Sequence, residues 1–252
     1  MRLSPAQQFR ARKLAAVMST AAAAAPGFAR PFHGADASEY DLQRARLGVD
    51  IRRLKEIQSI EKKIDLKRDL LPEYAPWVAG VLEAAAAGAR GVQDDILVQV
   101  MIWRIDVGDY DGALPLIDYV LRWSLALPER FNRTAATLIV EEIAEAALKS
   151  IKQGEDFSLE LLQRIHEVGA GHDMHDQVRA KLMKALGLQV ARMVDATPGD
   201  ADGPAGQRRA GINAALRYLR RAMELNSKAG VVKEIERLER LAKTISEGGT
   251  AA

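Results

Sequence analysis

The 252-residue sequence contains no cysteine. Disulfide bonds, thiol catalysis, iron–sulfur clusters and zinc sites built on cysteine are therefore excluded. Aromatic residues make up only 5% of the chain, and no stretch alternates apolar and polar residues for long enough to predict a sheet. Alanine, leucine, arginine, lysine, glutamate and glutamine are abundant instead, and they lose little side-chain entropy in a helix. The composition therefore predicts an all-α fold.

Long apolar runs are also missing. No stretch of about twenty strongly apolar residues occurs, so we expect no membrane span. Near the start, Arg10, Arg12 and Lys13 precede an alanine-rich stretch that ends at Ala25 and imitates a secretory signal. Alanine is a strong helix former but a weak hydrophobe, and two hydroxyl residues interrupt the run. We expect a basic, alanine-rich helix here, not a cleaved signal.

The charge is unevenly divided, although the net charge is only +2. Residues 1–68 contain 14 of the 36 Lys and Arg residues but only 7 of the 34 Asp and Glu residues, a balance of +7. The remainder contains 22 basic and 27 acidic residues, a balance of −5. This asymmetry predicts a polyanion-binding arm on a neutral-to-acidic body.

Proline, glycine and capping residues divide the chain. Ser38 is expected to cap a long helix, and Pro72 and Pro76 are expected to end it. The linker at 28–37 and a mobile loop at 197–206 follow from their proline and glycine content. Four segments are predicted: a basic N-terminal arm and linker over 1–38, a long basic helix over 39–71, a helical body over 72–246 and a disordered tail over 247–252.

The long helix carries one apolar face with steps of three, four or seven residues. Asp50 and Glu61 fall in its seam, so a regular coiled coil is not predicted. We expect this face to make subunit contacts in an oligomer; its residues are Leu47, Ile51, Leu54, Ile57 and Ile64.

Basic residues cover much of the rest of this helix and the start of the chain. Several Lys and Arg on one surface can neutralise DNA phosphates, but Glu56, Glu61 and Asp65 also fit an ordinary solvated face. No clear helix-turn-helix motif is present, and sequence readout could rest on oligomeric geometry and DNA shape in place of one recognition helix. The candidate DNA-binding residues are Arg10, Arg12, Lys13, Arg52, Arg53, Lys55, Lys62, Lys63, Lys67 and Arg68.

The body is expected to consist of stacked helical hairpins. Helix pairs over 92–127 and 210–245 each match the length of a tetratricopeptide-type unit, but only fragments of its consensus occur. Pro115 should kink the helix over 110–127 or delay its start. The three tryptophans lie in apolar segments, and we expect Trp77, Trp103 and Trp123 to pack in the core. The other expected helices span 134–153, 159–168, 176–194, 208–225 and 231–246.

Two groups of residues are candidates for catalytic or metal sites. His172 and His175 could share a helical face near carboxylates, but a turn that caps the next helix is the preferred interpretation. The pair Asp94-Asp95 could suggest a two-metal nuclease, yet carboxylates are expected in the first turn of a helix. A glycine-rich phosphate loop ending in Gly-Lys-Ser/Thr is absent. The sequence predicts no catalytic residues, no metal and no cofactor.

Several segments, in one order along the chain, resemble the small terminase subunits of temperate contractile-tailed phages of the peduovirus type. Pro115 and the loop at 200–206 depart from the expected pattern, and the very basic tail that some relatives carry is missing. The segments that resemble the family are Ser4-Pro5-Ala6-Gln7, Leu70-Leu71-Pro72, Pro76-Trp77-Val78, Gly80-Val81-Leu82-Glu83, Gln93-Asp94-Asp95-Ile96-Leu97, Trp103-Arg104, Asp106, Gly108-Asp109, Gly112-Ala113-Leu114, Val178-Arg179-Ala180-Lys181-Leu182, Ala229-Gly230-Val231 and Lys233-Glu234-Ile235-Glu236-Arg237-Leu238-Glu239.

The resemblance implies a DNA-packaging role. Such a subunit would recognise the packaging (cos) site on concatemeric double-stranded phage DNA, in the host cytoplasm, and present it to a large subunit that holds the ATPase and endonuclease activities. Small terminase subunits generally form rings, so self-association is also implied. A helical-repeat adaptor that binds peptides and never DNA remains the alternative.

Overall fold

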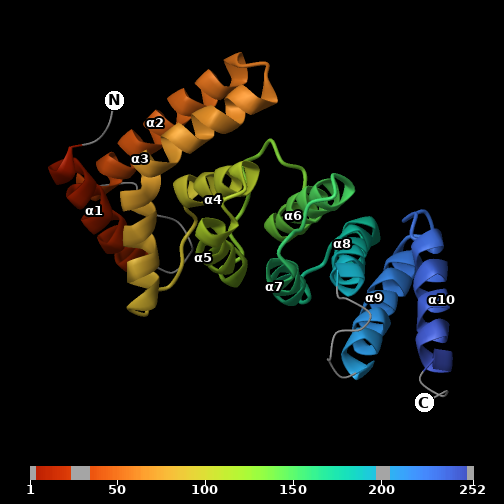
Figure 1. The fold of residues 1–252 in the computed structure, drawn as a ribbon. Coiled ribbons are helices and arrows are strands. Elements are labelled where there is room, and N and C mark those ends of the chain that lie inside the picture. Colours follow the sequence, from red (N-terminus) through yellow and green to blue (C-terminus); the bar gives the residue numbers. More distant parts are fainter. Residues whose placement is uncertain (1–3, 24–34, 197–204, 249–252) are drawn as a thin grey trace. The chain divides into compact units, whose positions relative to one another are not determined.

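The computed structural model describes residues 4–23, 35–196 and 205–248, and every regular element within these ranges is a helix (Figure 1). The all-α prediction is confirmed. Most of the predicted linker at 28–37, mobile loop at 197–206 and tail at 247–252 lies outside the described residues. The helices are α1 (Pro5–Ala23), α2 (Ala35–Glu56), α3 (Ile60–Ala86), α4 (Asp95–Val107), α5 (Tyr110–Arg122), α6 (Ala135–Lys152), α7 (Leu159–Gly169), α8 (Asp176–Ala196), α9 (Ala205–Leu225) and α10 (Val232–Gly248).

The chain forms two compact units, Met1–Ala135 and Ala136–Ala252. Unit 1 contains α1 to α5, and unit 2 contains α6 to α10. The boundaries of the four segments expected from the sequence stay a prediction, apart from the single helix expected over 39–71. None of the described helices combines the length and the apolarity that a membrane crossing requires.

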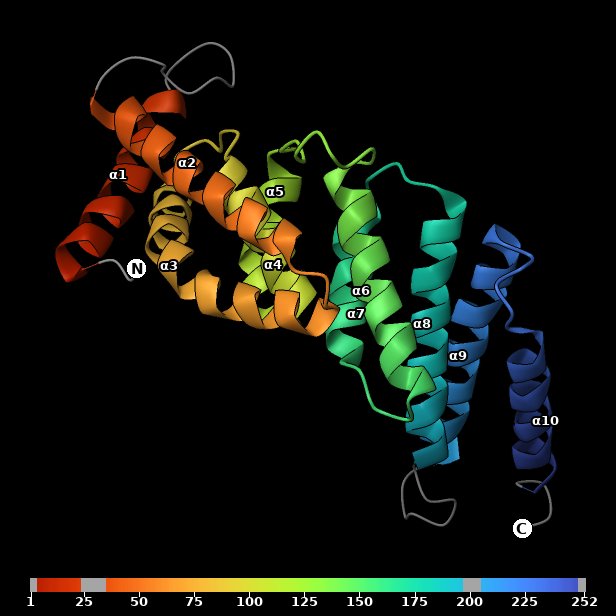
Figure 2. The ribbon, with the colours of Figure 1, turned by 90° about the horizontal axis from the view of Figure 1, so that it is seen from above.

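The single long helix predicted over 39–71 is wrong, because the structure has two helices there. Helix α2 begins earlier than Ser38, at Ala35, and ends at Glu56, and α3 begins at Ile60. Between them Ser59 is the N-cap of α3, and its hydroxyl accepts a hydrogen bond from the Lys62 backbone N–H at 3.4 Å. A serine favours a cap over a helix interior because it bonds the backbone locally. Figures 1 and 2 show α2 and α3 side by side as a hairpin.

Proline does not end the helix where the sequence predicted. Pro72 and Pro76 both lie inside α3, and Figures 1 and 2 show that this helix bends midway. A bend is the usual result of proline in a helix interior. Trp77 and Tyr74 beside the prolines are each 1% exposed, so tertiary burial offsets the local cost of about 3 kcal/mol per proline. Pro115 likewise lies inside α5, whose start is not delayed.

Helix α1 packs against α3 through small residues. Ala11 and Ala15 are 2% and 0% exposed. A Cβ atom added at Gly80 would lie 2.0 Å from the carbonyl oxygen of Arg12. The missing side chain at Gly80 therefore lets the two helix backbones touch, and Ala11 and Ala15 contribute to the packing face of α1.

Buried polar groups join α2 to the rest of unit 1. Asp50 is 5% exposed, and its Oδ2 accepts a hydrogen bond from the Tyr74 hydroxyl at 2.6 Å. Burial and this bond to a carboxylate raise the pKa of Tyr74 well above its ordinary value. Asp50, which interrupts the apolar face of the predicted long helix, thus makes a specific contact between α2 and α3.

Unit 2 is a row of closely packed helices, and α8, α9 and α10 lie side by side (Figure 2). A Cβ added at Gly187 of α8 would lie 2.6 Å from Leu219 Cγ of α9, and one at Gly211 would lie 2.6 Å from Val194 Cγ2. The expected hairpin of α9 and α10 is present. The core here consists of Val190, Ala191, Val194, Ile212, Ala215, Leu216, Leu219, Val231, Ile235 and Leu238.

Candidate DNA-binding surface

The candidate DNA-binding residues fall at three places in unit 1. Helix α1 carries the first three, the hairpin of α2 and α3 carries the next five around its turn, and the last two lie further along α3. In that order they are Arg10, Arg12 and Lys13; Arg52, Arg53, Lys55, Lys62 and Lys63; and Lys67 and Arg68.

Two of these residues connect helices within unit 1. Arg12 of α1 forms an ion pair with Glu83 of α3, and the hydrogen bond between them lowers the pKa of Glu83 and raises that of Arg12. Lys67 Nζ lies 2.6 Å from Asp106 Oδ2, with the two side chains 16% and 28% exposed. The Lys67 pair is mostly buried, so this ammonium group is less accessible to a phosphate, whereas the Arg12 pair is about half exposed and is weak.

Two more candidates form ion pairs within their own helix. Arg53 Nη1 lies 3.3 Å from Asp50 Oδ1, and Arg68 Nη1 lies 3.2 Å from Asp65 Oδ1. Both arginine side chains are more than half exposed. An exposed pair of this kind contributes only about 0–1 kcal/mol, so a phosphate can compete for either guanidinium group.

The remaining residues of the hairpin gather at its end. Arg52 and Lys55 close α2, and Lys62 and Lys63 open α3, with only residues 57–59 between the helices. Arg52, Lys55 and Lys62 are exposed and form no ion pair with a described residue, while Lys63 is half-buried. We call Arg52, Lys55, Lys62 and Lys63 the hairpin tip. The sequence supplied these residues, but the turn that brings them together was not predicted.

The apolar face proposed for subunit contact is only partly available. Leu47 and Leu54 are 4% and 7% exposed, because they pack within their own unit. Ile51, Ile57 and Ile64 are half-buried. A partner subunit could therefore reach only these three isoleucines without rearrangement of unit 1.

The acidic pair considered as a nuclease site has structural roles. Asp94 is fully buried and caps α4: its Oδ1 accepts from the backbone N–H groups of Ile96 and Leu97, both at 3.0 Å. Its Oδ2 accepts from Trp77 Nε1 at 3.0 Å. Asp95 Oδ2 lies 3.1 Å from Arg44 Nε. The prediction that these carboxylates open a helix is confirmed.

The histidines at the start of α8 lie in a turn. Asp176 is the first residue of α8, as the preferred interpretation expected. The His175 carbonyl oxygen accepts a hydrogen bond from the Val178 N–H at 2.9 Å. Within the described ranges, no group of three or more His, Asp or Glu side chains could hold a metal ion.

Two of the three tryptophans are core residues, as predicted. Trp77 is 1% exposed and Trp103 is 2% exposed. Trp123 is half-buried at the C-cap of α5, where its ring lies against Gly91 and the Arg122 guanidinium lies 5.1 Å from the ring centroid. Trp123 thus lies at the edge of the core.

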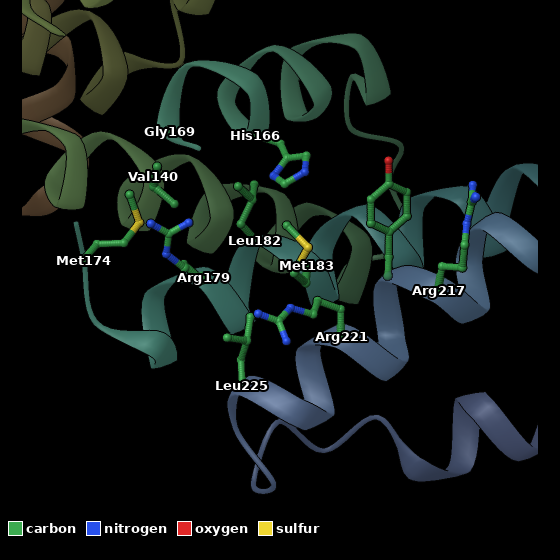
Figure 3. A pocket seen from close by; sticks show the side chains of 11 residues that line it. Val140, His166, Gly169, Met174, Arg179, Leu182, Met183, Arg217, Arg221 and Leu225 are labelled. Carbon is green, nitrogen blue, oxygen red and sulfur yellow. The ribbon is translucent and has the colours of Figure 1, made fainter. Parts of the chain in front are cut away.

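A pocket of about 330 Å³ in unit 2 was not predicted from the sequence (Figure 3). Its lining comes from four helices and the segment before α8, so no local motif could reveal it. The lining residues are Val140, His166, Gly169, Met174, Arg179, Leu182, Met183, Arg217, Tyr218, Arg221 and Leu225.

Comparison with known proteins finds one family and two relatives. The family model described as phage small terminase subunit matches residues 44–177. The chain is 43% identical over 204 residues to the "Terminase, endonuclease subunit" of Escherichia phage P2, which covers 81% of this chain and 74% of the relative. It is 25% identical over 218 residues to the "Probable terminase, endonuclease subunit" of Haemophilus phage HP1, which covers 86% of this chain and 74% of the relative. No solved structure matches.

Proposed function

The chain belongs to the phage small terminase subunit family, and from this premise we propose that it recognises the packaging (cos) site on concatemeric phage DNA. In this proposal it presents the site to a large subunit that holds the ATPase and nuclease activities. The observation that supports DNA contact is the hairpin tip, where exposed basic side chains from two helices lie around one turn.

The tip has the chemistry that phosphate binding needs. Each Lys or Arg that neutralises a phosphate releases condensed counterions, which strengthens binding at low salt. Arg52, Lys55 and Lys62 are exposed, so they are available for this exchange. Glu56 and Glu61 lie on the same turn region and reduce the local charge, so close fit to the DNA backbone would decide which basic groups contribute. Arg53 and Arg68 would add contacts when DNA displaces their weak ion pairs.

The test is a DNA-binding titration of the full chain with packaging-site DNA at several salt concentrations. Reversing all four tip residues to glutamate should lower the affinity strongly. It should also reduce the slope of log affinity against log salt by about 3–4 units, since each lost phosphate contact contributes about 0.9.

A matched control keeps the same change in net charge. Lys149, Lys152, Lys228 and Lys233 are exposed residues of unit 2, and we expect their reversal to glutamate to leave most of the salt slope intact. Equal losses of DNA affinity in the two variants would mean that DNA binding depends only on the net charge of the chain. Undiminished affinity of the tip variant would disprove the proposed surface.

Self-association into a ring is part of the proposal. Since Leu54 is buried, charging it would damage the fold, so the sharper test uses the half-buried Ile57. An Ile57→Glu variant should lower the mass seen by light scattering. The control is Gln58→Glu, which adds the same charge at the neighbouring, exposed position and should leave the mass unchanged. An unchanged mass of the Ile57 variant would remove this face from the proposal.

We also propose that cleavage belongs to the large subunit. The names of both relatives include "endonuclease subunit", so the opposite assignment needs a direct test. The proposal is supported by the capping and pairing roles of Asp94 and Asp95. The purified chain with Mg²⁺ or Mn²⁺ should leave packaging-site DNA intact, and the large subunit should cut it. Cleavage by the chain alone would overturn this assignment.

A further inference from the structure

The pocket of unit 2 has an apolar floor. Val140 of α6 and Leu182 and Met183 of α8 are buried, and Leu225 of α9 is half-buried. Met174 joins them from the segment before α8. Methionine side chains are flexible and polarizable, so they adapt to apolar groups of different shapes. A floor of this kind would take up an apolar side chain.

Guanidinium groups surround that floor. Figure 3 shows the Arg179 and Arg221 side chains beside the pocket, from α8 and α9, with Arg217 further along α9. Arg179 donates a hydrogen bond to the carbonyl oxygen of His172, which is a neutral partner, and forms no ion pair within the part of the chain that the structure describes. Arg217 is exposed and forms no ion pair with a described residue.

One of the arginines that line the pocket pairs with a carboxylate. Arg221 pairs with Glu224 at 2.9 Å, but both side chains are mostly exposed, 57% and 62%, so the pair is weak. No acidic residue is among those that line the pocket. His166 and Tyr218, whose rings stand edge to face with centroids 6.4 Å apart, complete the lining. The pocket therefore has complementary charge to an anionic ligand.

We propose that this pocket binds a short acidic segment of a partner protein, with an apolar side chain in the floor and flanking carboxylates on the arginines. Arginine suits this role because its planar fork can bond both oxygens of a carboxylate. The volume of about 330 Å³ lies at the small end of ligand pockets, which fits one or two side chains of a peptide. Buried anchors flanked by charged pairs are typical of interface hot spots.

A DNA backbone fits the pocket less well than a peptide. Phosphate contacts need exposed positive charge and gain nothing from an apolar floor of Leu and Met side chains. The hairpin tip offers exposed charge without a floor, and this pocket offers both. The inference is independent of the proposed DNA contact, because it concerns a different unit and a different ligand.

The test uses the full chain and a short fluorescein-labelled peptide in which leucine and glutamate alternate. Fluorescence anisotropy should show saturable binding below about 1 mM. A peptide with lysine in place of glutamate, and one with alanine in place of leucine, should bind at least about tenfold more weakly, a difference of about 1.4 kcal/mol. Equal binding of the three peptides, or no saturable binding of the first, would overturn the proposal.

Variants locate the binding on the chain. Arg217→Gln together with Arg221→Gln should weaken the acidic peptide at least tenfold, whereas Arg220→Gln with Arg240→Gln, an equal loss of exposed charge outside the lining, should not. An equal effect of both pairs would refute the pocket assignment. Methyl-labelled methionine gives a readout that needs no variant. The resonances of Met174 and Met183 should shift on binding, while that of Met101 in the core of unit 1 should not.

Competition separates the peptide from DNA. Packaging-site DNA should not displace the peptide, and the four-residue tip variant, which should lose DNA affinity, should still bind it. If DNA displaces the peptide and the Arg217 and Arg221 variant loses DNA affinity instead, the pocket is a DNA contact and the peptide proposal fails. Failure of the tip variant to change DNA affinity would refute the proposed DNA surface alone.

Discussion

The two units keep their polar groups in different places. In unit 1 two acids are buried: Asp50 accepts from Tyr74, and Asp94 accepts from Trp77. In the described part of unit 2 no acid is buried: Lys181 pairs with Glu141 and Glu145 at or near the surface, and the interior is mainly apolar contact with a few neutral polar groups such as Gln189, which accepts from the Phe157 N–H. Unit 1 therefore adds hydrogen bonds of buried acids to close packing such as that at Gly80, whereas in unit 2 the fit of the helix surfaces predominates.

The difference matches the two proposed roles. A DNA-contacting hairpin must hold its basic groups at fixed positions, and the bond from Tyr74 of α3 to Asp50 of α2 ties the two helices of the hairpin together. A pocket that takes up side chains of a partner benefits from adaptable apolar contacts, and methionine lines that of unit 2. Substitutions that remove one kind of contact should therefore affect one unit and spare the other.

The largest effect is expected from Asp94→Ala. The change removes the N-cap of α4 and leaves the Trp77 indole N–H buried without its acceptor. Losing a cap costs about 0.5–2 kcal/mol, and an unsatisfied buried donor costs about 1–3 kcal/mol, so unit 1 should lose about 2–4 kcal/mol. All three tryptophans of the chain lie in unit 1, so urea unfolding followed by tryptophan fluorescence reports this unit alone.

The neighbouring carboxylate provides the control for that measurement. Asp95 pairs with Arg44, whose side chain is 58% exposed, so Asp95→Ala should cost less than about 1 kcal/mol. If the two variants were equally unstable, the burial of Asp94 would not be what stabilises unit 1.

A smaller loss, confined to unit 2, is expected from Gly187→Ala. The added methyl group would meet Leu219 Cγ at 2.6 Å, so α8 and α9 must move apart. Overpacking of this kind costs about 1–3 kcal/mol. Urea unfolding followed by circular dichroism should show the loss of stability. The transition followed by tryptophan fluorescence, which reports unit 1, should keep the urea midpoint of the original chain. Gly171→Ala, where a Cβ meets nothing within 4 Å, should change neither curve.

Tyr74→Phe tests the hydrogen bond of unit 1 through its pH dependence. Loss of the hydroxyl should cost about 1–3 kcal/mol at pH 7, because Asp50 is then left buried without this donor. Burial raises the pKa of Tyr74 above that of tyrosine in the unfolded chain, which is about 10. The unfolded state thus releases the proton first, so the free energy of unfolding should fall as the pH rises above about 10.

The variant should lack that contribution, which is about 1.4 kcal/mol per pH unit for one proton. Burial also raises the pKa of Tyr110, so part of the alkaline loss should persist in Tyr74→Phe. An alkaline loss of the same size in both proteins would show that the Tyr74 hydroxyl does not stay protonated in the folded state.

The parts of the fold and of the candidate sites that the sequence could predict are those determined by neighbouring residues in the chain. The turn at Gly108-Asp109 has a local cause that the sequence displays. Glycine readily adopts the positive φ of a helix C-cap, here 78° at Gly108, and aspartate is a favoured N-cap, as Asp109 is for α5. The break at Ser59 was missed, because Ile57 and Ile64 continue the apolar periodicity across it. The helix through Pro72 and Pro76 was missed since its stability comes from burial against other helices. The pocket depends on residues as far apart as Val140 and Leu225, which only the fold brings together.

The smallest expected effect has the opposite sign and comes from Gly48→Ala in α2. A Cβ at this position would meet only Arg52 Nη1, at the ordinary contact distance of 3.6 Å. Alanine restricts the unfolded chain more than glycine does, so the variant should be more stable by about 0.5–1 kcal/mol. Tryptophan fluorescence should record a higher urea midpoint with an unchanged slope. A loss of stability would mean that α2 approaches another surface at Gly48, as α1 approaches α3 at Gly80, and that a subunit contact lies on this side of the hairpin.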